Sequence, residues 1–332
     1  MRLAIRVSLS LALVGVLVWR IPDFDMNELF PRFGIGNAAW LLAAGVTLLG
    51  AFVLQTLRWS QVLHALGHRV SFPRLLAEFL AGQFISNVVP AAIGGDVMRI
   101  ARMGRHIGDR ADAFASVALE RLTGWIVLPG ISLVAIAITP GFQHLPQHAT
   151  TVAVGVDLVA LAGLLGVLGF AANRRWSDAE RTTTGWRRWI GSLHLGLGII
   201  GRHPASIFGV LAAGVAFQVT QCLSIWLTAK ALDVPQVGVA ASLAFFPPTA
   251  IAQNAPVGFG GLGVREGAFV LFFGSLGVAD ARAIAVGLVG YVLMVGTSAL
   301  GAPAFALGGW RKEMAGSGES EPRPLMEAPE AS

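Results

Sequence analysis

Long apolar runs, separated by short stretches of charged residues, make up most of the chain. A membrane-spanning helix needs about 20 predominantly apolar residues. Two stretches, 75–97 and 239–277, are apolar but interrupted by Gly and Pro, and the first also carries polar side chains that disfavour contact with lipid. Six other runs have roughly the length of a span: about 3–19, 38–57, 113–139, 149–172, 206–231 and 283–309. The pattern predicts an all-α polytopic membrane protein with about six full transmembrane helices and two interrupted segments.

The two interrupted segments carry the same motif. Residues Pro90 to Arg99 and Pro256 to Arg265 both have the spacing Pro-x-x-x-Gly-Gly-x-x-x-Arg, and the two copies start half of the 332-residue chain apart. Gly/Pro interruptions at corresponding positions of two halves are typical of inverted-repeat transporters, whose binding site lies near the bilayer midplane. The repeat therefore predicts two related halves.

The distribution of arginine predicts how these segments lie in the membrane, because cytoplasmic loops carry an excess of Lys and Arg. Both flanks of segment 75–97 are rich in Arg, so both of its ends are expected in the cytoplasm and the segment is expected to be a re-entrant hairpin. Loops 58–74, 98–111 and 173–204 are the Arg-rich ones, whereas 20–37, 140–148 and 232–238 are expected outside. The same signal places the N- and C-termini in the cytoplasm.

These assignments divide the chain into two copies of the order helix, helix, hairpin, helix. Residues 1–139 form the first copy and residues 140–309 the second, which must insert upside down because three crossings are an odd number. In the second copy, residues 186–201 have apolar side chains at helical spacing and are expected to lie as a helix in the cytoplasmic interface. Residues 310–332 are rich in Gly, Ser, Pro and Glu and are expected to form a disordered cytoplasmic tail.

Composition supports this assignment and excludes several classes of protein. Hydrophobic residues make up 55% of the chain and charged residues 13%, against about 25% charge in soluble domains. A single cysteine, Cys222, rules out a disulfide framework and a Cys-based metal site. The chain has no Walker A, HExxH or GxSxG motif, so neither ATP-driven transport, a cofactor nor a metal is implied, and we do not expect an enzyme. The net charge of +5 reflects loop arginines and implies no nucleic-acid partner.

The repeated motif supplies the first candidate chemistry. Its paired glycines permit a tight turn and leave backbone N–H groups exposed at a helix N-terminus, which is an anion-binding arrangement. Asp96 is expected to cap the helix that follows Gly94 and Gly95. Arg99 and Arg265 are costly at membrane depth unless they are paired or solvated, so both are expected to line a cavity. A guanidinium binds phosphate through two hydrogen bonds, which favours a phospholipid head group as the ligand.

A second charged pair, Glu120 and Arg121, lies about 12 Å inside the predicted span 113–139 by helical rise. Neighbouring residues point about 100° apart on a helix, so each is expected to pair with another element. We expect Arg121 to pair with Asp96, and Glu120 with Arg58 or Arg99. Three roles stay open for these pairs: locking the hairpin in place, contacting the substrate, or coupling a proton step.

Four further polar residues stand in or beside the apolar segments. Asn87 and Asn254 come shortly before the motif prolines and are expected to hydrogen-bond the hairpin tips. Glu266 is a candidate counter-ion for its neighbour Arg265. Asp157 lies inside a predicted span and is either a hydrogen-bonding group between packed helices or a protonatable one.

Taken in order, these motifs resemble the flippase-like membrane region of the lysylphosphatidylglycerol synthase family over about residues 1–310. The residues that carry the resemblance are Arg58-Trp59, Asn87-Val-Val-Pro90, Gly94-Gly95-Asp96-x-x-Arg99, Ala118-Leu-Glu120-Arg121 and Gly260-Gly261-Leu-Gly263-Val-Arg265-Glu266. The resemblance implies movement of a lipid, typically one with a phosphate in its head group, between leaflets of a prokaryotic plasma (inner) membrane. The soluble aminoacyl-tRNA-dependent transferase domain of the full synthases is absent, so lysyl transfer is not expected.

The function predicted from the sequence is a lipid flippase or flippase-like transporter. Its expected partner is a membrane phospholipid or a polyprenyl-phosphate lipid. The expected substrate-binding residues are Arg58, Asn87, Gly94, Gly95, Asp96, Arg99, Glu120, Arg121, Asn254, Gly260, Gly261, Arg265 and Glu266. Two alternatives stay open: an intramembrane enzyme acting on polyprenyl phosphates, with Glu78, Asp96 or Glu120 as a base, or an accessory subunit of a separate lipid-synthesising enzyme.

Overall fold

A computed structural model describes residues 34–88, 94–145, 147–171, 194, 204–254 and 261–307, and within these residues it contains helices and no strands. The α-helices are α3 (Ile35–Ala65), α4 (Phe72–Val88), α5 (Gly94–Ile107), α6 (Arg110–Ile138), α7 (Gln147–Ala171), α9 (Pro204–Ala231), α10 (Val239–Gln253), α11 (Val264–Gly274), α12 (Asp280–Ser298) and α13 (Ala302–Leu307). Two short 3₁₀ helices, η1 (Pro140–His144) and η4 (Ala299–Gly301), also lie within the described residues.

Five helical stretches of the described residues are long and apolar enough to cross a membrane. They are Ile35–Ala65, Arg110–Ile138, His148–Ala171, Ile207–Ala231 and Asp280–Ala306, and they match five of the six predicted spans. The sixth predicted span, 3–19, lies outside the described residues, as do the predicted interfacial helix 186–201 and the tail 310–332. The all-helical fold with several candidate membrane-spanning helices is therefore confirmed for the described residues, and the count of six stays a prediction.

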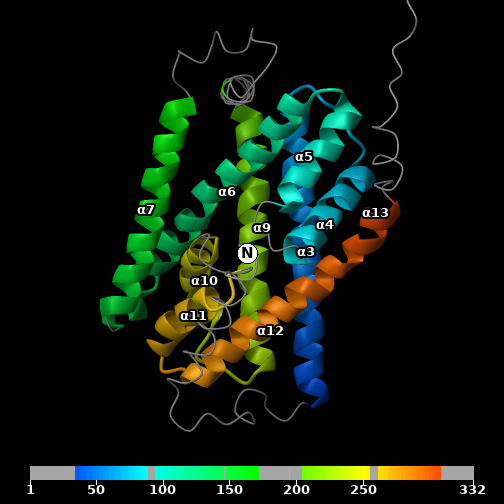
Figure 1. Ribbon diagram of the computed structural model, residues 1–332. Helices are drawn as coiled ribbons and strands as arrows, with labels where there is room; N and C mark the ends of the chain where they lie inside the picture. The colour runs from blue at the N-terminus through cyan, green and yellow to red at the C-terminus, as the bar shows by residue number, and fades with distance from the viewer. Residues whose placement is uncertain are drawn as a thin grey trace, which may run out of the picture.

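Each interrupted segment folds as two helices that pack against each other. Helices α4 and α5 form the first pair, and α10 and α11 form the second. Figure 1 shows the two pairs toward opposite ends of the long helices α3 and α9. This placement is what two oppositely inserted copies would produce; re-entrance into a membrane and the inverted repeat stay predictions.

The first pair extends further than expected. The stretch 98–111 was expected to be a basic loop, but α5 continues to Ile107. The reason is that α5 is amphipathic: it buries Met103 and Gly104 while exposing Arg105 and His106. A helix can carry basic side chains on one face and still pack with the other.

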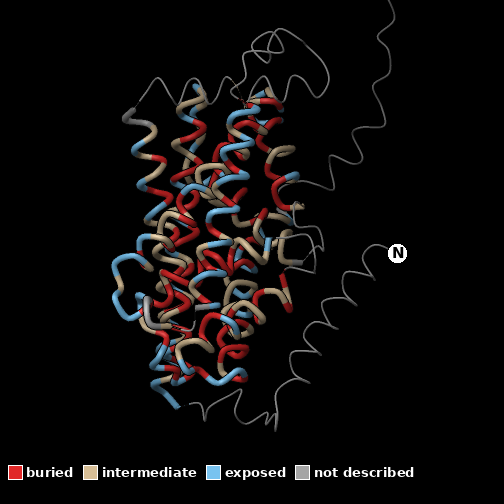
Figure 2. The backbone as a smooth tube through the Cα atoms, turned by 90° about the vertical axis from the view of Figure 1, so that its left-hand side faces the viewer, coloured by how far each residue is buried: buried red, intermediate tan, exposed pale blue. Residues whose placement is uncertain are grey.

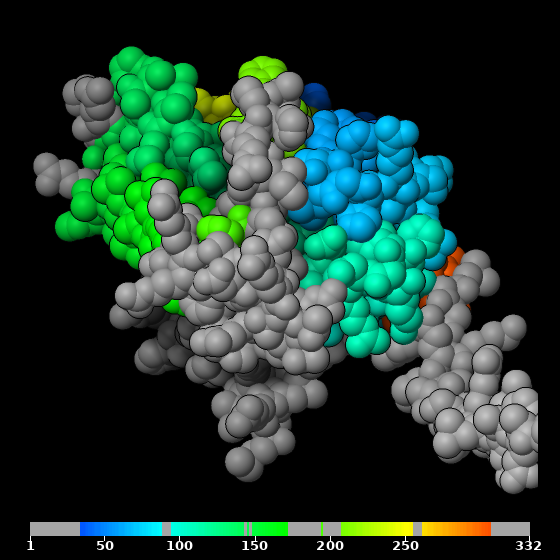
Figure 3. Space-filling view, turned by 90° about the horizontal axis from the view of Figure 1, so that it is seen from above, coloured from blue at the N-terminus to red at the C-terminus, as the bar shows by residue number. Residues whose placement is uncertain are grey.

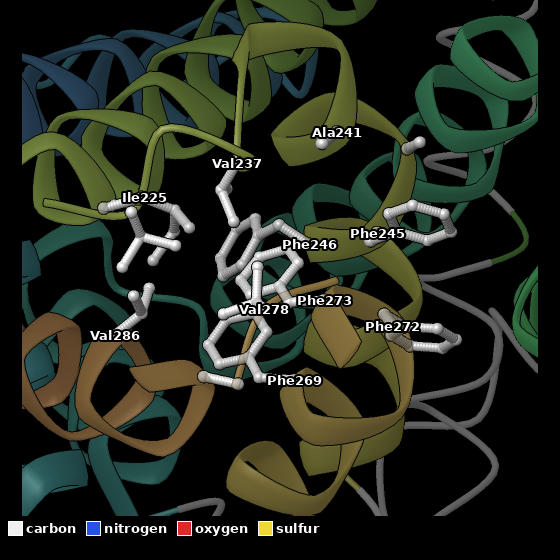
Figure 4. Close-up of a cluster of buried hydrophobic side chains, with 14 of the residues drawn as sticks. Ile225, Val237, Ala241, Phe245, Phe246, Phe269, Phe272, Phe273, Val278 and Val286 are labelled. Carbon is white, nitrogen blue, oxygen red and sulfur yellow. The ribbon is translucent and has the colours of Figure 1, made fainter. Parts of the chain in front are cut away.

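Two large apolar clusters and a small third one form the core of the described residues, and buried positions gather in the interior of the bundle (Figure 2). One cluster joins Phe52, Trp59, Phe79 and Met103 of α3, α4 and α5. The other is rich in phenylalanine and joins α9, α10, α11 and α12. In it, the rings of α10 and α11 stack with centroids 5.4 Å apart, as Phe245 and Phe272 do in Figure 4. Each helix pair thus has its own apolar support.

The motif glycines have different structural roles in the two copies. Gly95 is the point where α5 crosses α4: a Cβ there would approach the carbonyl oxygen of Gly82 well inside 3.0 Å. In the second copy, Gly261 and Gly263 have φ angles of 75° and 85° and form the turn before α11. Only the second copy therefore uses these glycines for left-handed turn geometry.

The expectation that Gly94 and Gly95 form a turn is wrong, because α5 begins at Gly94 and includes both. The expected N-cap role of Asp96 is wrong for the same reason. Asp96 lies in the first turn of α5, where its negative charge interacts favourably with the positive end of the helix dipole. Gly260 lies outside the described residues.

Candidate functional site

Five charged side chains from α3, α5 and α6 meet in the interior of the bundle. Arg121 of α6 pairs with Asp96 of α5, and Arg99 of α5 pairs with Glu120 of α6. Arg58 of α3 joins them, with its Nη2 3.7 Å from Glu120 Oε1. These are the pairs expected from the sequence, and we call the five residues the arginine cluster.

Helical spacing explains how α5 and α6 each contribute two members of the cluster. Asp96 and Arg99 are three residues apart on α5 and lie on one face, with a guanidinium-to-carboxylate distance of 3.6 Å. Glu120 and Arg121 are adjacent on α6 and point in different directions, so each contacts a different residue of α5. The cluster thus holds α5 against α6 through two separate ion pairs.

Aromatic rings surround the guanidinium of Arg99. Its Cζ lies 4.1 Å from the centroid of the Trp59 ring and 5.1 Å from that of Phe79. The Trp59 indole N–H donates to Ser116 Oγ at 3.1 Å, which fixes the orientation of the ring. A cation desolvated against aromatic faces and paired with carboxylates is well stabilised. Arg99 is therefore a structural part of the core, with only 4% of its surface exposed.

Arg58 lies in a space that two glycines create. A Cβ added at Gly124 of α6 or Gly214 of α9 would lie 3.3 or 3.2 Å from Arg58 Nη1. The guanidinium also faces the ring of Phe217 at 5.5 Å. Gly124 and Gly214 therefore leave the room that the Arg58 guanidinium occupies.

Gln55 is a member of this site that the sequence analysis did not identify. Its side-chain amide donates to Glu120 Oε1 from one turn before Arg58 on α3. The signal was present, because a glutamine one helical turn from an arginine in an apolar span lies on the same face.

The arginine cluster carries one excess positive charge. Three guanidinium groups face two carboxylates, and burial differs sharply among them. Arg58, Arg99 and Glu120 are nearly inaccessible, whereas 47% of the Arg121 side chain is exposed. The accessible part of the excess charge is therefore at Arg121.

The second motif copy forms a smaller, neutral site on α11. Arg265 donates from Nε to Glu266 Oε1 at 3.0 Å, as expected for its counter-ion. Glu266 Oε2 also accepts the backbone N–H of Gly263 at 2.7 Å and so caps the helix. The Tyr291 ring lies 4.5 Å from the Arg265 guanidinium. Among the described residues, no ion pair joins this site to the arginine cluster.

The expected bonds of Asn87 and Asn254 to the hairpin tips stay predictions, because residues 89–93 and 255–260 lie outside the described residues. Asn87 Nδ2 donates to Ser298 Oγ at 3.0 Å, which ties α4 to the end of α12. Asn254 Nδ2 donates to the carbonyl of Ala250 one turn earlier in α10. Both bonds stabilise helix ends and neighbours, because an amide near a helix terminus satisfies the nearest free polar group.

Two other candidate carboxylates have distinct surroundings. Glu78 of α4 pairs with Arg102 of α5 at 2.9 Å, outside the arginine cluster. Asp157 of α7 is fully buried, and neither of its carboxylate oxygens bonds a partner among the described residues. Ser132 of α6 lies beside Asp157 and donates its hydroxyl to the carbonyl of Ala244 at 2.7 Å.

An apolar groove of about 850 Å³ lies between α6, α7 and α10. Its α6 wall runs from Ala118 to Trp125 and its α7 wall from Val152 to Val167, while Ile251 and Ala252 of α10 close one side. Arg121 is the single charged residue in this lining. The groove therefore brings an apolar surface next to the accessible end of the arginine cluster.

A sequence model described as "Lysylphosphatidylglycerol synthase TM region" matches residues 5–301. The chain belongs to this family. The match covers both interrupted segments, all five members of the arginine cluster and the groove, so the site described above is part of the family's membrane region.

The chain is similar in sequence to two proteins of archaea, which differ in length. One is "Glycosyltransferase AglD" of Haloferax volcanii, 28% identical over 334 residues, covering 86% of this chain and 50% of AglD. The other is a "UPF0104 membrane protein" of Methanothermobacter thermautotrophicus, 24% identical over 311 residues, covering 85% of this chain and 87% of the relative. The chain thus spans about half the length of AglD.

The chemistry available at the site is that of anion binding. In the described part of the chain, no group of three or more His, Cys, Asp or Glu residues could hold a metal ion. Asp96, Glu120 and Glu266 are each bonded to arginine. A cluster with excess positive charge beside an apolar groove suits an amphiphile with an anionic head.

Proposed function

We propose that this protein moves a phosphate-bearing lipid between the leaflets of a prokaryotic plasma membrane. The observation that carries the proposal is the arginine cluster: three guanidinium groups and two carboxylates in the interior of a membrane protein. Buried charges are usually balanced by their partners. The unbalanced positive charge favours an anionic ligand, and arginine is the residue best suited to phosphate.

The accessibility of Arg121 supports a ligand role. Arg99 and Arg58 are enclosed by carboxylates and rings, so a lipid head group can reach the cluster through Arg121. A phosphate that approaches Arg121 would lie close to the other cluster members and gain from their field as well. The Arg265–Glu266 pair is neutral and carries no excess positive charge. Because it lies in the second motif, it stays a candidate to contact the lipid at a later stage of transport.

The state of the carboxylates supports transport over catalysis. A general base needs a carboxylate that is free to accept a proton from the reacting group. Glu78, Asp96 and Glu120 each form an ion pair with an arginine, so none of the three is a free carboxylate. This arrangement favours binding of an anion over proton abstraction from a polyprenyl phosphate.

A second candidate function is that of an accessory to lipid-linked sugar chemistry. The chain aligns with half the length of a protein named a glycosyltransferase. In this interpretation, the membrane region of the present chain handles a lipid while a separate enzyme carries out the sugar transfer. This interpretation predicts activity only when a separate enzyme is present.

The test is lipid movement by the purified protein in liposomes. Phospholipids with a fluorescent head group, one anionic and one zwitterionic, would be followed by quenching from outside. We expect the wild type to move the phosphate-bearing lipids, and Arg121→Gln, which removes the excess charge, to lower the rate about tenfold, as a loss of about 1.4 kcal/mol would.

Arg69→Gln is the matched control, because Arg69 is exposed in the turn after α3 and lies outside the cluster. It should move lipid at the wild-type rate. A wild type that moves neither phospholipid nor a labelled polyprenyl phosphate would overturn the transport proposal. Movement that appears only after a glycosyltransferase is added would support the accessory function instead.

A further inference from the structure

We propose that the groove between α6, α7 and α10 binds the hydrocarbon chain of a phosphate-bearing lipid while Arg121 contacts the phosphate. The inference rests on the proposed function and names the surface that the lipid uses. It makes α7 one wall of the lipid path, although the sequence analysis assigned no binding residue to this helix.

The first support is the length and openness of the groove. Its α7 wall, from Val152 to Val167, extends about 22 Å by helical rise. One leaflet contributes about half of the hydrocarbon core of roughly 30 Å, so the groove can hold a chain along its full leaflet depth. A Cβ at Gly155 or Gly163 would meet no atom of the described residues within 4 Å, so no side chain among them fills the space there.

The second support is the position of the single charge. Arg121 lines the groove and also pairs with Asp96. Its bond to Asp96 runs from Nε, and among the described residues its two terminal amino groups bond no other side chain. Those amino groups can bind the oxygens of a phosphate in the fork geometry that guanidinium prefers.

The surroundings identify the occupant as a lipid. Helix α7 stands at one side of the molecule, away from α4 and α5, as Figures 1 and 3 show. Its side chains Val159 and Leu165 are 74% and 68% exposed, which suits a helix in contact with membrane lipid. A helix of another protein copy would cover Arg121 with apolar surface and supply no anion. A lipid supplies both the apolar chain and the anionic head.

The experiment uses photo-crosslinking, because it reports binding without requiring movement. The full-length protein in liposomes would be irradiated with a phosphate-bearing phospholipid that carries a photoreactive group on its acyl chain. A polyprenyl phosphate with a photoreactive chain forms a second arm, and a photoreactive diacylglycerol, which lacks phosphate, forms a third. Modified peptides would be located by mass spectrometry.

Two matched variants separate the groove from the rest of α7. Gly163→Trp fills the groove, whereas Gly169→Trp places the same side chain about 120° away on the same helix, also with no atom within 4 Å. We expect adducts on α6 and α7 in the wild type and in Gly169→Trp, and at least about tenfold fewer in Gly163→Trp, the change that 1.4 kcal/mol of lost binding produces. Arg121→Gln should lower labelling by the phosphate lipids and leave labelling by diacylglycerol unchanged.

The outcomes distinguish this inference from the proposed function. Equal labelling of the two tryptophan variants would overturn the groove site. So would lipid adducts found only on helices other than α6, α7 and α10. If the wild type moves lipid and Gly163→Trp moves it equally fast, transport stands and the groove site fails. If the groove is labelled as expected but no lipid moves, the groove is a lipid-binding site and the transport proposal fails. The stronger of the two phosphate arms identifies the chain, acyl or isoprenoid.

Discussion

Single arginines in the interior differ in how far the protein itself neutralises their charge. Arg99 contacts two carboxylates and two aromatic rings. Arg121 contacts one carboxylate and keeps 47% of its side chain exposed. The Arg99 guanidinium is therefore required by the folded state, while that of Arg121 is available to a ligand.

Substitution of these two arginines should separate stability from binding. Arg99→Ala leaves Glu120 buried with one fewer cation, and breaking a buried pair in this way costs about 3–5 kcal/mol. Arg121→Ala should cost less than about 1 kcal/mol, because exposed ion pairs are screened by solvent. Thermal unfolding of the purified protein in detergent, followed by tryptophan fluorescence, measures both.

A restoring variant provides the control for Arg99. Arg99→Lys keeps the charge and should recover part of the lost unfolding temperature, although it loses the planar contact with Trp59. Equal destabilisation by Arg99→Ala and Arg121→Ala would contradict the distinction between a structural and a binding arginine.

The ion pairs could be predicted from the sequence because few alternatives exist for a charge inside an apolar span. Glu120 and Arg121 needed partners on other elements, and the sequence offered only a few charged residues at membrane depth. Gln55 was missed because a neutral amide imposes no such requirement. The capping role given to Asp96 was wrong because helix starts depend on tertiary packing, and α4 supports α5 from Gly94 onward.

Among the elements, the contact between α4 and α5 depends on close approach of their backbones. Gly95 lies against the carbonyl of Gly82, and Gly301 of η4 lies against the carbonyl of Leu80. Helix α4 is thus packed closely on two sides, and small residues at such crossings allow backbones to approach in membrane proteins. The close packing of α5 on α4 thereby places Asp96 and Arg99 next to Glu120 and Arg121 of α6.

Gly95→Ala should therefore destabilise the protein and displace α5. The new methyl group would meet backbone atoms of Gly82, which cannot move without shifting a helix. Overpacking of this kind typically costs about 1–3 kcal/mol. Thermal unfolding measures the loss, and the rate of lipid movement reports whether the arginine cluster is disturbed.

Gly50→Ala is the matched control within α3. A Cβ at Gly50 would meet no atom within 4 Å, and alanine is favoured over glycine inside a helix by roughly 0.5–1 kcal/mol. The control should be neutral or slightly stabilising. A Gly95→Ala protein as stable as Gly50→Ala would show that α4 and α5 are not in close backbone contact.

Elements of the fold differ in how well the sequence predicts them. Five predicted spans match long apolar helices of the structure, because the length of an apolar run is set by the membrane and not by neighbours. The groove was not foreseen, because the apolar residues of α7 could equally have packed against another helix. Gly155 and Gly163 were the only local hint of a space, and glycine alone does not distinguish a groove from a close helix contact.

For the whole molecule, the two predicted halves differ in the charge of their motif sites among the described residues. The first half contributes a cluster with one excess positive charge, spread over three helices. The second contributes a neutral pair confined to α11. If the predicted inverted repeat holds, these unequal sites favour one path for the ligand, along α6 and α7, over two equivalent ones.

The inverted arrangement itself can be tested with cysteine labelling, since Cys222 is buried and is the only cysteine. In a Cys222→Ala background, Arg69→Cys and Gln236→Cys each introduce one exposed thiol, in the turn after α3 and the turn after α9. These turns lie at opposite ends of the long helices (Figure 1).

We expect a membrane-impermeant maleimide to label Gln236→Cys in intact spheroplasts, and Arg69→Cys only after permeabilisation. The reason is that Arg-rich loops stay in the cytoplasm, while residues 232–238 contain no Lys or Arg. Labelling of both from one side would contradict the placement of the α4–α5 and α10–α11 pairs on opposite faces. Reversed labelling would keep the repeat but exchange its sides, so that a lipid would reach Arg121 from the opposite leaflet.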